Sequence, residues 1–292
     1  MAMENIVSRH ETAISRNSDD FVPDRDGGFA EHLLQNAFNA IYHNEVYNCD
    51  WDMFWTTHPD AEKHALLRAI SGGPVYFSDR IGETNPDIVS KLCLLDGRLL
   101  MLDRSACVSE DCTFSDPFSD CAIKIQNAGT CFDGRKLGVV AAFNLTENEQ
   151  MVRVSASDIL ELEGTGAYLL YDYRRKEAEK LEKGEAKEVF LEPGDYAYFI
   201  ILPLEKSDAV LSLGLSDKYV GVLALENTEN KENGVVFTVK ETGNFMFVSE
   251  RIPTSLFVNG KNCLDKLIQA GKNVYEVILE PSNEKMMIEI LL

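Results

Sequence analysis

Ile70-Ser-Gly-Gly-Pro-Val-Tyr-Phe-Ser-Asp79 is the stretch that decides the fold of this chain. Its Ser-Gly-Gly-Pro segment ends a helical pattern that begins near His58, and a short buried strand is expected over 75–78, leading into a carboxylate. The alternation also extends upstream, where a candidate strand over 12–15 precedes a helical pattern over 31–46. Alternating strands and helices, with polar residues where strands end, are typical of a parallel α/β barrel or a doubly wound sheet.

This alternation of strands and helices covers residues 1–120, and the segment is too short for a closed barrel. Only about three strand–helix units are found, whereas a (β/α)8 barrel has eight. In barrels the chemistry lies at the carboxyl ends of the strands. Four aspartates of this region can occupy such places: Asp19, Asp20, Asp52 and Asp79.

The pattern becomes all-β after about residue 120. Buried apolar strands are expected over 137–144, 167–173 and 196–202, with turn signals such as Asn233-Gly234 in the sequence that follows. Short strands at this spacing predict that residues 121–292 form an antiparallel β-sandwich. The expected fold class is therefore α/β followed by all-β.

The composition describes an acidic protein with enough apolar residues for a core. Lys and Arg number 28 against 48 Asp and Glu, which gives a formal net charge of −20 over 292 residues. A charge of this sign argues against nucleic acid or an anionic membrane as a partner. The seven cysteines include no Cys-x-x-Cys pair, which predicts reduced thiols in a cytoplasmic protein. Neither a signal peptide nor a membrane span is expected.

Two blocks carry candidate chemistry, Arg16-Asn-Ser-Asp-Asp20 and Asp50-Trp51-Asp52. Neighbouring side chains on an extended chain point to opposite sides, so one of Asp19 and Asp20 can face a pocket while the other holds the loop. Arginine, carboxylates and an aromatic face suit a carbohydrate site, and a carboxylic acid with a raised pKa can act as a general acid. The alternative interpretation is structural: an Asx-turn or helix cap in the first block, and a core tryptophan between turn aspartates in the second.

Other kinds of site have weak support in the sequence. His58 and His64 do not have His-Glu-x-x-His spacing, so no metal site is expected. Gly72-Gly73-Pro74 is not followed by the Gly-Lys-Ser/Thr of a phosphate loop, and no Gly-x-Ser-x-Gly elbow is found. We therefore predict no cofactor.

The motifs resemble the raffinose synthase / seed imbibition protein branch of glycoside hydrolase family 36. The resemblance rests on Arg-x-Ser-Asp-Asp-Phe-x-Pro at Arg16–Pro23, Asp-Trp-Asp-Met-Phe-x-x-x-His-Pro-x-Ala-Glu-x-His-Ala at Asp50–Ala65, and Arg-Ala-Ile-Ser-Gly-Gly-Pro-Val-Tyr-x-Ser-Asp at Arg68–Asp79. Further matches follow in the family's order: Leu95-Asp-Gly-Arg98, Asp111-Cys-Thr-Phe-Ser-Asp-Pro117, Lys124-Ile-Gln-Asn127 and Gly138-Val-Val-Ala-Ala-Phe-Asn144.

This resemblance implies a fold and an activity. Residues 1–120 would be the last strands and helices of a (β/α)8 catalytic barrel, and residues 121–292 a C-terminal β-sandwich. The chemistry implied is retaining hydrolysis of α-galactosides, or galactosyl transfer from them, with raffinose-type oligosaccharides as substrates.

The resemblance also assigns roles to residues. The acid/base of the family lies in the block that matches Arg16–Asp20, where Asp19 is the first choice and Asp20 the alternative. Arg16, Trp51 and Asp52 are expected to line the sugar subsite.

One part of the family's machinery has no counterpart before Arg16, namely the nucleophilic aspartate of a Lys-x-Asp motif. A retaining mechanism needs two carboxyl groups about 5–5.5 Å apart. The chain is therefore expected to be a truncated or split enzyme, inactive alone or active with a second chain that carries the missing half of the barrel. The alternatives are a non-catalytic remnant that binds carbohydrate or is structural, and a piece of a longer protein. A half barrel exposes apolar faces, so association or aggregation is also expected.

Overall fold

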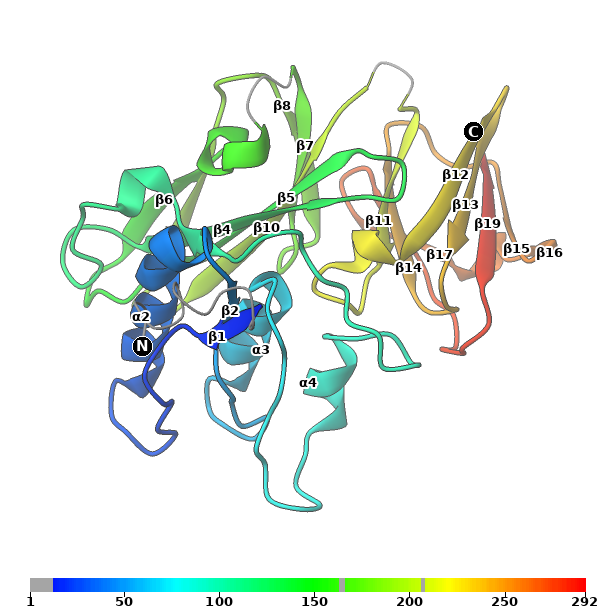
Figure 1. The fold of residues 1–292 in the computed structure, drawn as a ribbon. Coiled ribbons are helices and arrows are strands. Elements are labelled where there is room, and N and C mark those ends of the chain that lie inside the picture. The colour runs from blue at the N-terminus through cyan, green and yellow to red at the C-terminus, as the bar shows by residue number, and fades with distance from the viewer. Residues whose placement is uncertain (1–12, 163–165, 206–207) are drawn as a thin grey trace.

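The structure, a computed structural model, describes residues 13–162, 166–205 and 208–292. Helices gather at one end of a set of antiparallel sheets (Figure 1). In this part of the chain no helix has both the length and the apolar character needed to cross a membrane.

A parallel strand–helix–strand unit begins the described chain. β1 (Ile14–Arg16) and β2 (Asn48–Asp50) pair in parallel, and α2 (Gly28–His43) connects them. The helix predicted over 31–46 is thus confirmed, but it begins and ends earlier, at Gly28 and His43. The predicted first strand is also found, although its Thr12 lies outside the described residues.

Two shorter helices follow, α3 (Ala61–Ile70) and α4 (Pro86–Ser90). The strand predicted over 75–78 between them is wrong in extent and in burial. Phe77 makes only an isolated parallel bridge with Phe54, and the side chains of Tyr76 and Phe77 are 36% and 39% exposed. The prediction of a buried strand rested on apolar character alone, and it is wrong because these aromatic rings lie at the surface.

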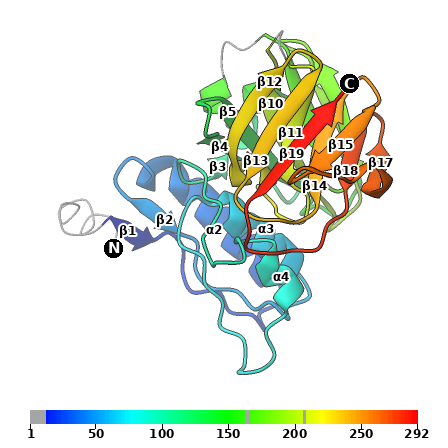
Figure 2. The same cartoon turned by 90° about the vertical axis from the view of Figure 1, so that its right-hand side faces the viewer.

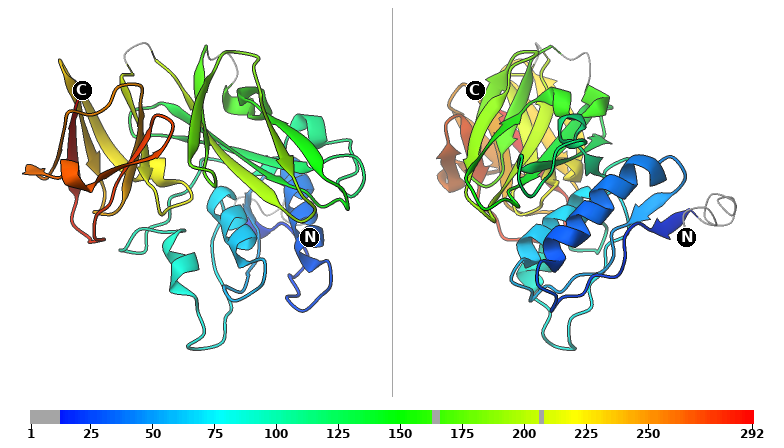
Figure 3. Two further views of the ribbon diagram at one scale, coloured as in Figure 1. Left: turned by 180° about the vertical axis from the view of Figure 1, so that it is seen from behind. Right: turned by 90° about the vertical axis from the view of Figure 1, so that its left-hand side faces the viewer.

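Six antiparallel strands form the central sheet, in the order β3-β4-β5-β10-β7-β8. Their bounds are Cys107–Val108 (β3), Ile123–Thr130 (β4), Lys136–Phe143 (β5), Tyr168–Asp172 (β7), Glu177–Leu181 (β8) and Tyr196–Pro203 (β10). Helix α2 lies against this sheet (Figure 3), where the ring centroids of Phe29 and Phe143 are 5.7 Å apart. A separate pair, β6 (Gln150–Val154) and β9 (Lys187–Leu191), shares a second apolar cluster with the sheet.

The side chains of β5 alternate between these two clusters. Val139 and Ala141 belong to the cluster that contains the helices, and Val140 and Ala142 to the cluster that contains β6 and β9. Because successive residues of a strand point to opposite faces, both faces of β5 are buried. This explains why residues 137–144 read as one continuous apolar run.

Two further antiparallel sheets complete the chain (Figure 2). One is ordered β11-β14-β18-β17 and the other β12-β13-β19-β15-β16. Side chains from both sheets meet between them, as the 5.6 Å separation of the Phe237 and Phe245 rings shows. The strand bounds are Val210–Leu215 (β11), Leu225–Lys231 (β12), Gly234–Val239 (β13), Phe245–Ser249 (β14), Ser255–Val258 (β15), Lys261–Asn262 (β16), Leu267–Gly271 (β17), Val274–Val277 (β18) and Met286–Leu291 (β19).

Short 3₁₀ helices interrupt the loops at Glu110–Cys112, Ala156–Asp158, Leu160–Leu162, Gly221–Ala224 and Leu264–Lys266. Just before the fourth of these, the Tyr219 hydroxyl donates to Glu62 Oε2 of α3 at 2.5 Å, and Lys218 Nζ donates to the Ser90 carbonyl of α4 at 2.8 Å. These bonds join the helices to the C-terminal sheets.

The antiparallel, β-rich structure predicted after residue 120 is confirmed. The boundary at residue 120, the single sandwich over 121–292 and the barrel over 1–120 stay predictions. Within the described residues, the parallel pairing consists of β1 with β2 and the bridge between Phe54 and Phe77.

Candidate functional site

The carboxyl ends of β1 and β2 bring polar side chains of three chain segments together. Arg16 is the last residue of β1 and lies opposite Asp50, the last residue of β2. Asp52 follows two residues later, and Tyr76 precedes the bridge at Phe77. We call Arg16, Asp20, Asp50, Asp52 and Tyr76 the Arg16 cluster.

Arg16 contacts all three carboxylates of the cluster. Its Nη1 lies 2.8 Å from Asp20 Oδ1, its Nη2 lies 2.8 Å from Asp52 Oδ1, and its Nε lies 3.5 Å from Asp50 Oδ2. Burial lowers the pKa of Arg16, but Asp52, Tyr76 and Asp50 outweigh burial and raise the pKa above its ordinary value. The guanidinium therefore stays charged.

Tyr76 completes the cluster. Its hydroxyl donates to Asp50, with separations of 2.9 and 3.1 Å to the two carboxylate oxygens, and lies 3.3 Å from Asp52 Oδ1. The same hydroxyl accepts from Arg16 Nη2 at 3.2 Å. Burial, followed by the hydrogen bond to Asp50, raises the pKa of Tyr76 to about 12. Sequence reasoning did not select Tyr76, and its place at the end of a matched motif was the signal that could have found it.

Asp52 is held in an unusual backbone conformation. Its φ is 62°, in the left-handed region that non-glycine residues seldom adopt. Its amide donates to Asp50 Oδ1 at 2.9 Å, and its Oδ2 accepts from the Phe21 amide at 2.7 Å. Strained backbone of this kind gathers at functional sites, where the surroundings hold it. The side chain is only 4% exposed, so its direction is fixed.

Asp19 and Asp20 make different contacts. The Asp20 side chain is 89% exposed and reaches Arg16. The Asp19 amide donates to Gln35 Oε1 at 2.8 Å, and among the described residues its carboxylate makes no ion pair. The cavity beside the two aspartates measures about 20 Å³, the size of a single water site. Both aspartates are exposed to solvent.

The other predicted site residues lie elsewhere. Trp51 is fully buried, as expected for a core tryptophan. Its role in the sugar subsite stays a prediction. Asp79 accepts from the amide and hydroxyl of Thr56, both at 2.7 Å, and so supports a loop. Trp55 is half-buried and donates from Nε1 to Ser78 Oγ at 3.0 Å.

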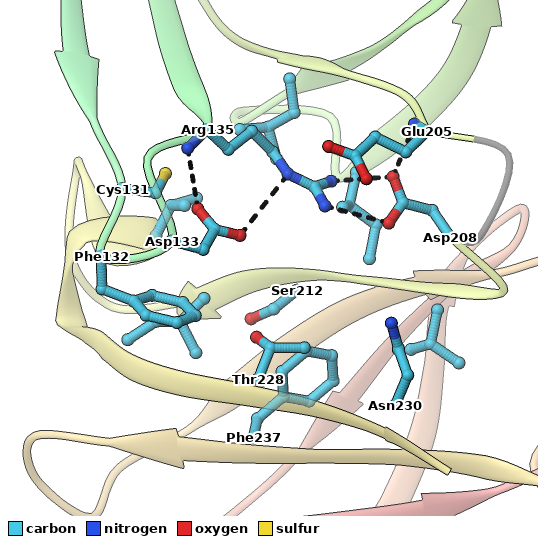
Figure 4. Close-up of a pocket in the computed structure, with 15 residues that line it drawn as sticks. Cys131, Phe132, Asp133, Arg135, Glu205, Asp208, Ser212, Thr228, Asn230 and Phe237 are labelled. Atoms are coloured by element: carbon cyan, nitrogen blue, oxygen red, sulfur yellow. Dashed lines mark hydrogen bonds and ion pairs between the residues drawn. The ribbon is translucent and has the colours of Figure 1, made fainter. Parts of the chain in front are cut away.

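No group of three or more His, Cys, Asp or Glu side chains in the described ranges is arranged to hold a metal ion. A separate pocket of about 250 Å³ lies between the central sheet and the C-terminal sheets (Figure 4). There Arg135 makes two bonds of 2.8 and 3.0 Å to Asp208, with Phe132 and Thr228 nearby. This pocket includes no residue of the Arg16 cluster.

Comparison with protein families gives one match. The family described as raffinose synthase or seed imbibition protein Sip1 matches residues 3–151, which is more than half of the 292-residue chain. This range contains the whole Arg16 cluster.

Curated relatives match over longer stretches. A galactinol–sucrose galactosyltransferase of Oryza sativa subsp. japonica is 28% identical over 298 residues, which cover 88% of this chain and 37% of the rice protein. A galactinol–sucrose galactosyltransferase of Pisum sativum is 29% identical over 196 residues, 60% of this chain and 25% of the pea protein. The chain thus spans little more than a third of the length of the rice relative, and less of the pea relative.

Solved structures allow a comparison of the fold. A GH27 β-L-arabinopyranosidase of Geobacillus stearothermophilus superimposes with a TM-score of 0.50 at 14% identity, covering 70% of this chain and 48% of that one. At this identity the likeness concerns the fold alone.

Proposed function

Because the chain belongs to the raffinose synthase or seed imbibition protein Sip1 family, we propose that the Arg16 cluster binds the galactosyl unit of an α-galactoside. Its chemistry would be retaining hydrolysis or galactosyl transfer, with raffinose-type oligosaccharides as substrates. The observation that carries the proposal is one arginine shared by three carboxylates and a tyrosine hydroxyl at the carboxyl ends of two parallel strands. Neighbouring sugar hydroxyls need donors and acceptors side by side, and this cluster offers both.

In this proposal Asp20 is the acid/base, in preference to Asp19, which was the first choice from the sequence. Its Oδ1 contacts Arg16, which ties it to the cluster, and its side chain is 89% exposed. A general acid must come within hydrogen-bond reach of the glycosidic oxygen. An exposed carboxylate beside the sugar-binding groups can meet this requirement.

Asp50 and Asp52 take the sugar-binding role. Their oxygens already accept from Arg16 and Tyr76, so they are held as acceptors for hydroxyl groups. We propose that the nucleophile of the retaining mechanism is a further carboxylate outside the Arg16 cluster. We propose further that this carboxylate is supplied from outside the 292-residue chain, which would then bind the sugar and turn over little or none of it.

Tyr76→Phe tests the binding half of the proposal. Titration calorimetry with galactose should show an affinity about fivefold lower in the variant, because one hydrogen-bonding hydroxyl is worth about 1 kcal/mol. Asp96→Asn, at an exposed turn outside the cluster, is the control and should bind like the parent chain. Absence of heat with the parent chain, or equal affinity in Tyr76→Phe, would count against the proposal.

Asp20→Asn and Asp19→Asn test the catalytic half. The purified chain should hydrolyse an aryl α-galactoside no faster than either variant. Hydrolysis that Asp20→Asn abolishes and Asp19→Asn preserves would support the acid/base assignment and overturn the expected lack of turnover. The reverse pattern would transfer the role to Asp19.

A further inference from the structure

Arg68 is buried behind the Arg16 cluster, and we infer that it is a positioning residue for Asp52. It holds the backbone of residues 51–53 in the turn that presents the Asp52 carboxylate to Arg16 and Tyr76. The consequence for sugar binding rests on the proposed function, whereas the consequence for the geometry of Asp52 does not.

The guanidinium of Arg68 binds three successive carbonyl groups. Nη2 donates to the carbonyls of Trp51 at 2.8 Å and Met53 at 3.0 Å, and Nε donates to the carbonyl of Asp52 at 3.3 Å. In a regular strand, successive residues point to opposite sides. Three neighbouring carbonyl groups can therefore reach one side chain only where the backbone leaves the strand conformation. The left-handed conformation of Asp52 provides that departure.

The direction of the Asp52 side chain follows from this turn. With the backbone held from behind, Oδ1 faces Arg16 at 2.8 Å and Oδ2 accepts from the Phe21 amide at 2.7 Å. An extended backbone at Asp52 would turn the side chain away from these partners, because reversing φ changes the direction of Cβ. Arg68 thus acts on the sugar-binding carboxylate without touching it.

Two histidines complete the surroundings of Arg68. Nη1 lies 3.1 Å from His64 Nδ1, and Nη2 lies 3.4 Å from His32 Nδ1. A guanidinium only donates, so His64 Nδ1 accepts from Nη1 and the His64 ring carries its proton on Nε2. The two hydrogens of Nη2 already point to the Trp51 and Met53 carbonyls, so its approach to His32 is a contact. His32 Nε2 is hydrogen-bonded to Ser18 Oγ at 3.0 Å. Through His32, Arg68 also supports the loop that leads to Asp19 and Asp20.

If Arg68 only filled space in the core, an uncharged side chain could take its place. Arg68 is 1% exposed, and a buried charge is costly unless its donors are satisfied. Within the described residues, carbonyls and the neutral ring of His64 satisfy it in place of a carboxylate partner. Burial lowers the pKa of Arg68 to about 10, so the group is still charged at neutral pH.

The test compares Arg68→Lys with Arg135→Lys. Arg135 is bound to Asp208 and lines a pocket that contains no residue of the Arg16 cluster. Lysine keeps the charge but cannot bind three carbonyls as a planar fork. In Arg68→Lys, hydrogen exchange of the Phe21 amide, followed by NMR, should accelerate at least about tenfold, and galactose affinity should fall about tenfold, as for one lost hydrogen bond to a charged group. Arg135→Lys should change neither quantity.

A double-mutant cycle separates positioning from general loss of stability. If Arg68 acts through Asp52, Arg68→Lys combined with Asp52→Asn should bind galactose no more weakly than Asp52→Asn alone. Full additivity, or unchanged Phe21 exchange in a folded Arg68→Lys, would overturn the inference. If Arg68→Lys does not fold, Arg68→Gln replaces it, because glutamine keeps two N–H donors without a buried charge. If the parent chain binds no galactose, the proposed function fails and Phe21 exchange alone decides on Arg68.

Discussion

At the scale of single residues, buried histidines make the fold sensitive to acid. Burial, followed by the charge of Arg68, lowers the pKa of His32 to about 3, and the same two causes lower the pKa of His64 well below its ordinary value. A histidine in the unfolded chain takes up a proton near its ordinary pKa of about 6.5. The folded state is therefore favoured above that pH and loses stability as the pH falls below it.

Urea unfolding measured between about pH 7 and about pH 5 checks this expectation. The unfolding free energy should fall by up to about 1.4 kcal/mol per pH unit for each histidine below pH 6.5. Replacing both rings, as His32→Gln with His64→Gln, should flatten the profile in that window even if the variant is less stable. An equally steep profile in the double variant would assign the acid sensitivity to other groups.

The sequence predicted some residues of the site and missed others for physical reasons. Arg16, Asp20 and Asp52 stand where strands end, a position that periodicity can find. Tyr76 and Arg68 could not be selected, because an aromatic residue in an apolar run and an arginine on a helix are both ordinary features. Only the three-dimensional approach of α3 to the 51–53 turn reveals what Arg68 binds.

At the scale of elements, Gly73 sets the spacing between β2 and the chain that follows α3. A Cβ at this position would lie 2.1 Å from the Cys49 carbonyl oxygen, a backbone atom that cannot move alone. Gly73→Ala should therefore destabilise the protein by more than about 2 kcal/mol, in the range of overpacking substitutions. It should also weaken galactose binding, because the displaced segment carries Tyr76.

Gly97→Ala is the matched control for Gly73→Ala. Gly97 also lies in a turn, with φ 86°, and a methyl group added there would meet no atom within 4 Å. The substitution should cost only about 1 kcal/mol, from the left-handed backbone alone, and leave galactose binding unchanged. Thermal and chemical unfolding of both variants measure the difference. An equal loss of unfolding free energy in the two variants would show that contact with the Cys49 carbonyl does not cause the effect of Gly73→Ala.

Elements were easier to predict than their pairing. The 3.6-residue pattern of α2 and the continuous apolar run of β5 both survive in the structure, since each reflects a local burial pattern. The separation of the second half into a central sheet and two C-terminal sheets has no local signal. Strand order depends on contacts between residues distant in sequence, such as those of β12, β13 and β19.

At the scale of the whole molecule, Tyr219 joins the helices to the C-terminal sheets. Tyr219→Phe removes the bond to Glu62, a residue that Lys91 also contacts at 2.6 Å. The unfolding free energy should fall by about 1–2 kcal/mol, the cost of losing a part-buried hydrogen bond to a charged group. Galactose affinity should not change, because the Arg16 cluster is untouched. Tyr275→Phe, which removes the hydroxyl of another buried tyrosine, is the control. A comparable loss there would assign the effect to removal of a tyrosine hydroxyl in general and not to the bond with Glu62.

The open face beside Asp19 and Asp20 has a kinetic consequence. A ligand that is covered on one side keeps much of its hydration and can leave without any part of the protein moving. For millimolar affinity and ordinary association rates of about 10⁵–10⁷ M⁻¹s⁻¹, the residence time would be about ten milliseconds or less. Sugar bound to this chain should therefore exchange rapidly with the bulk, so that resonances of Tyr76 shift gradually during a titration.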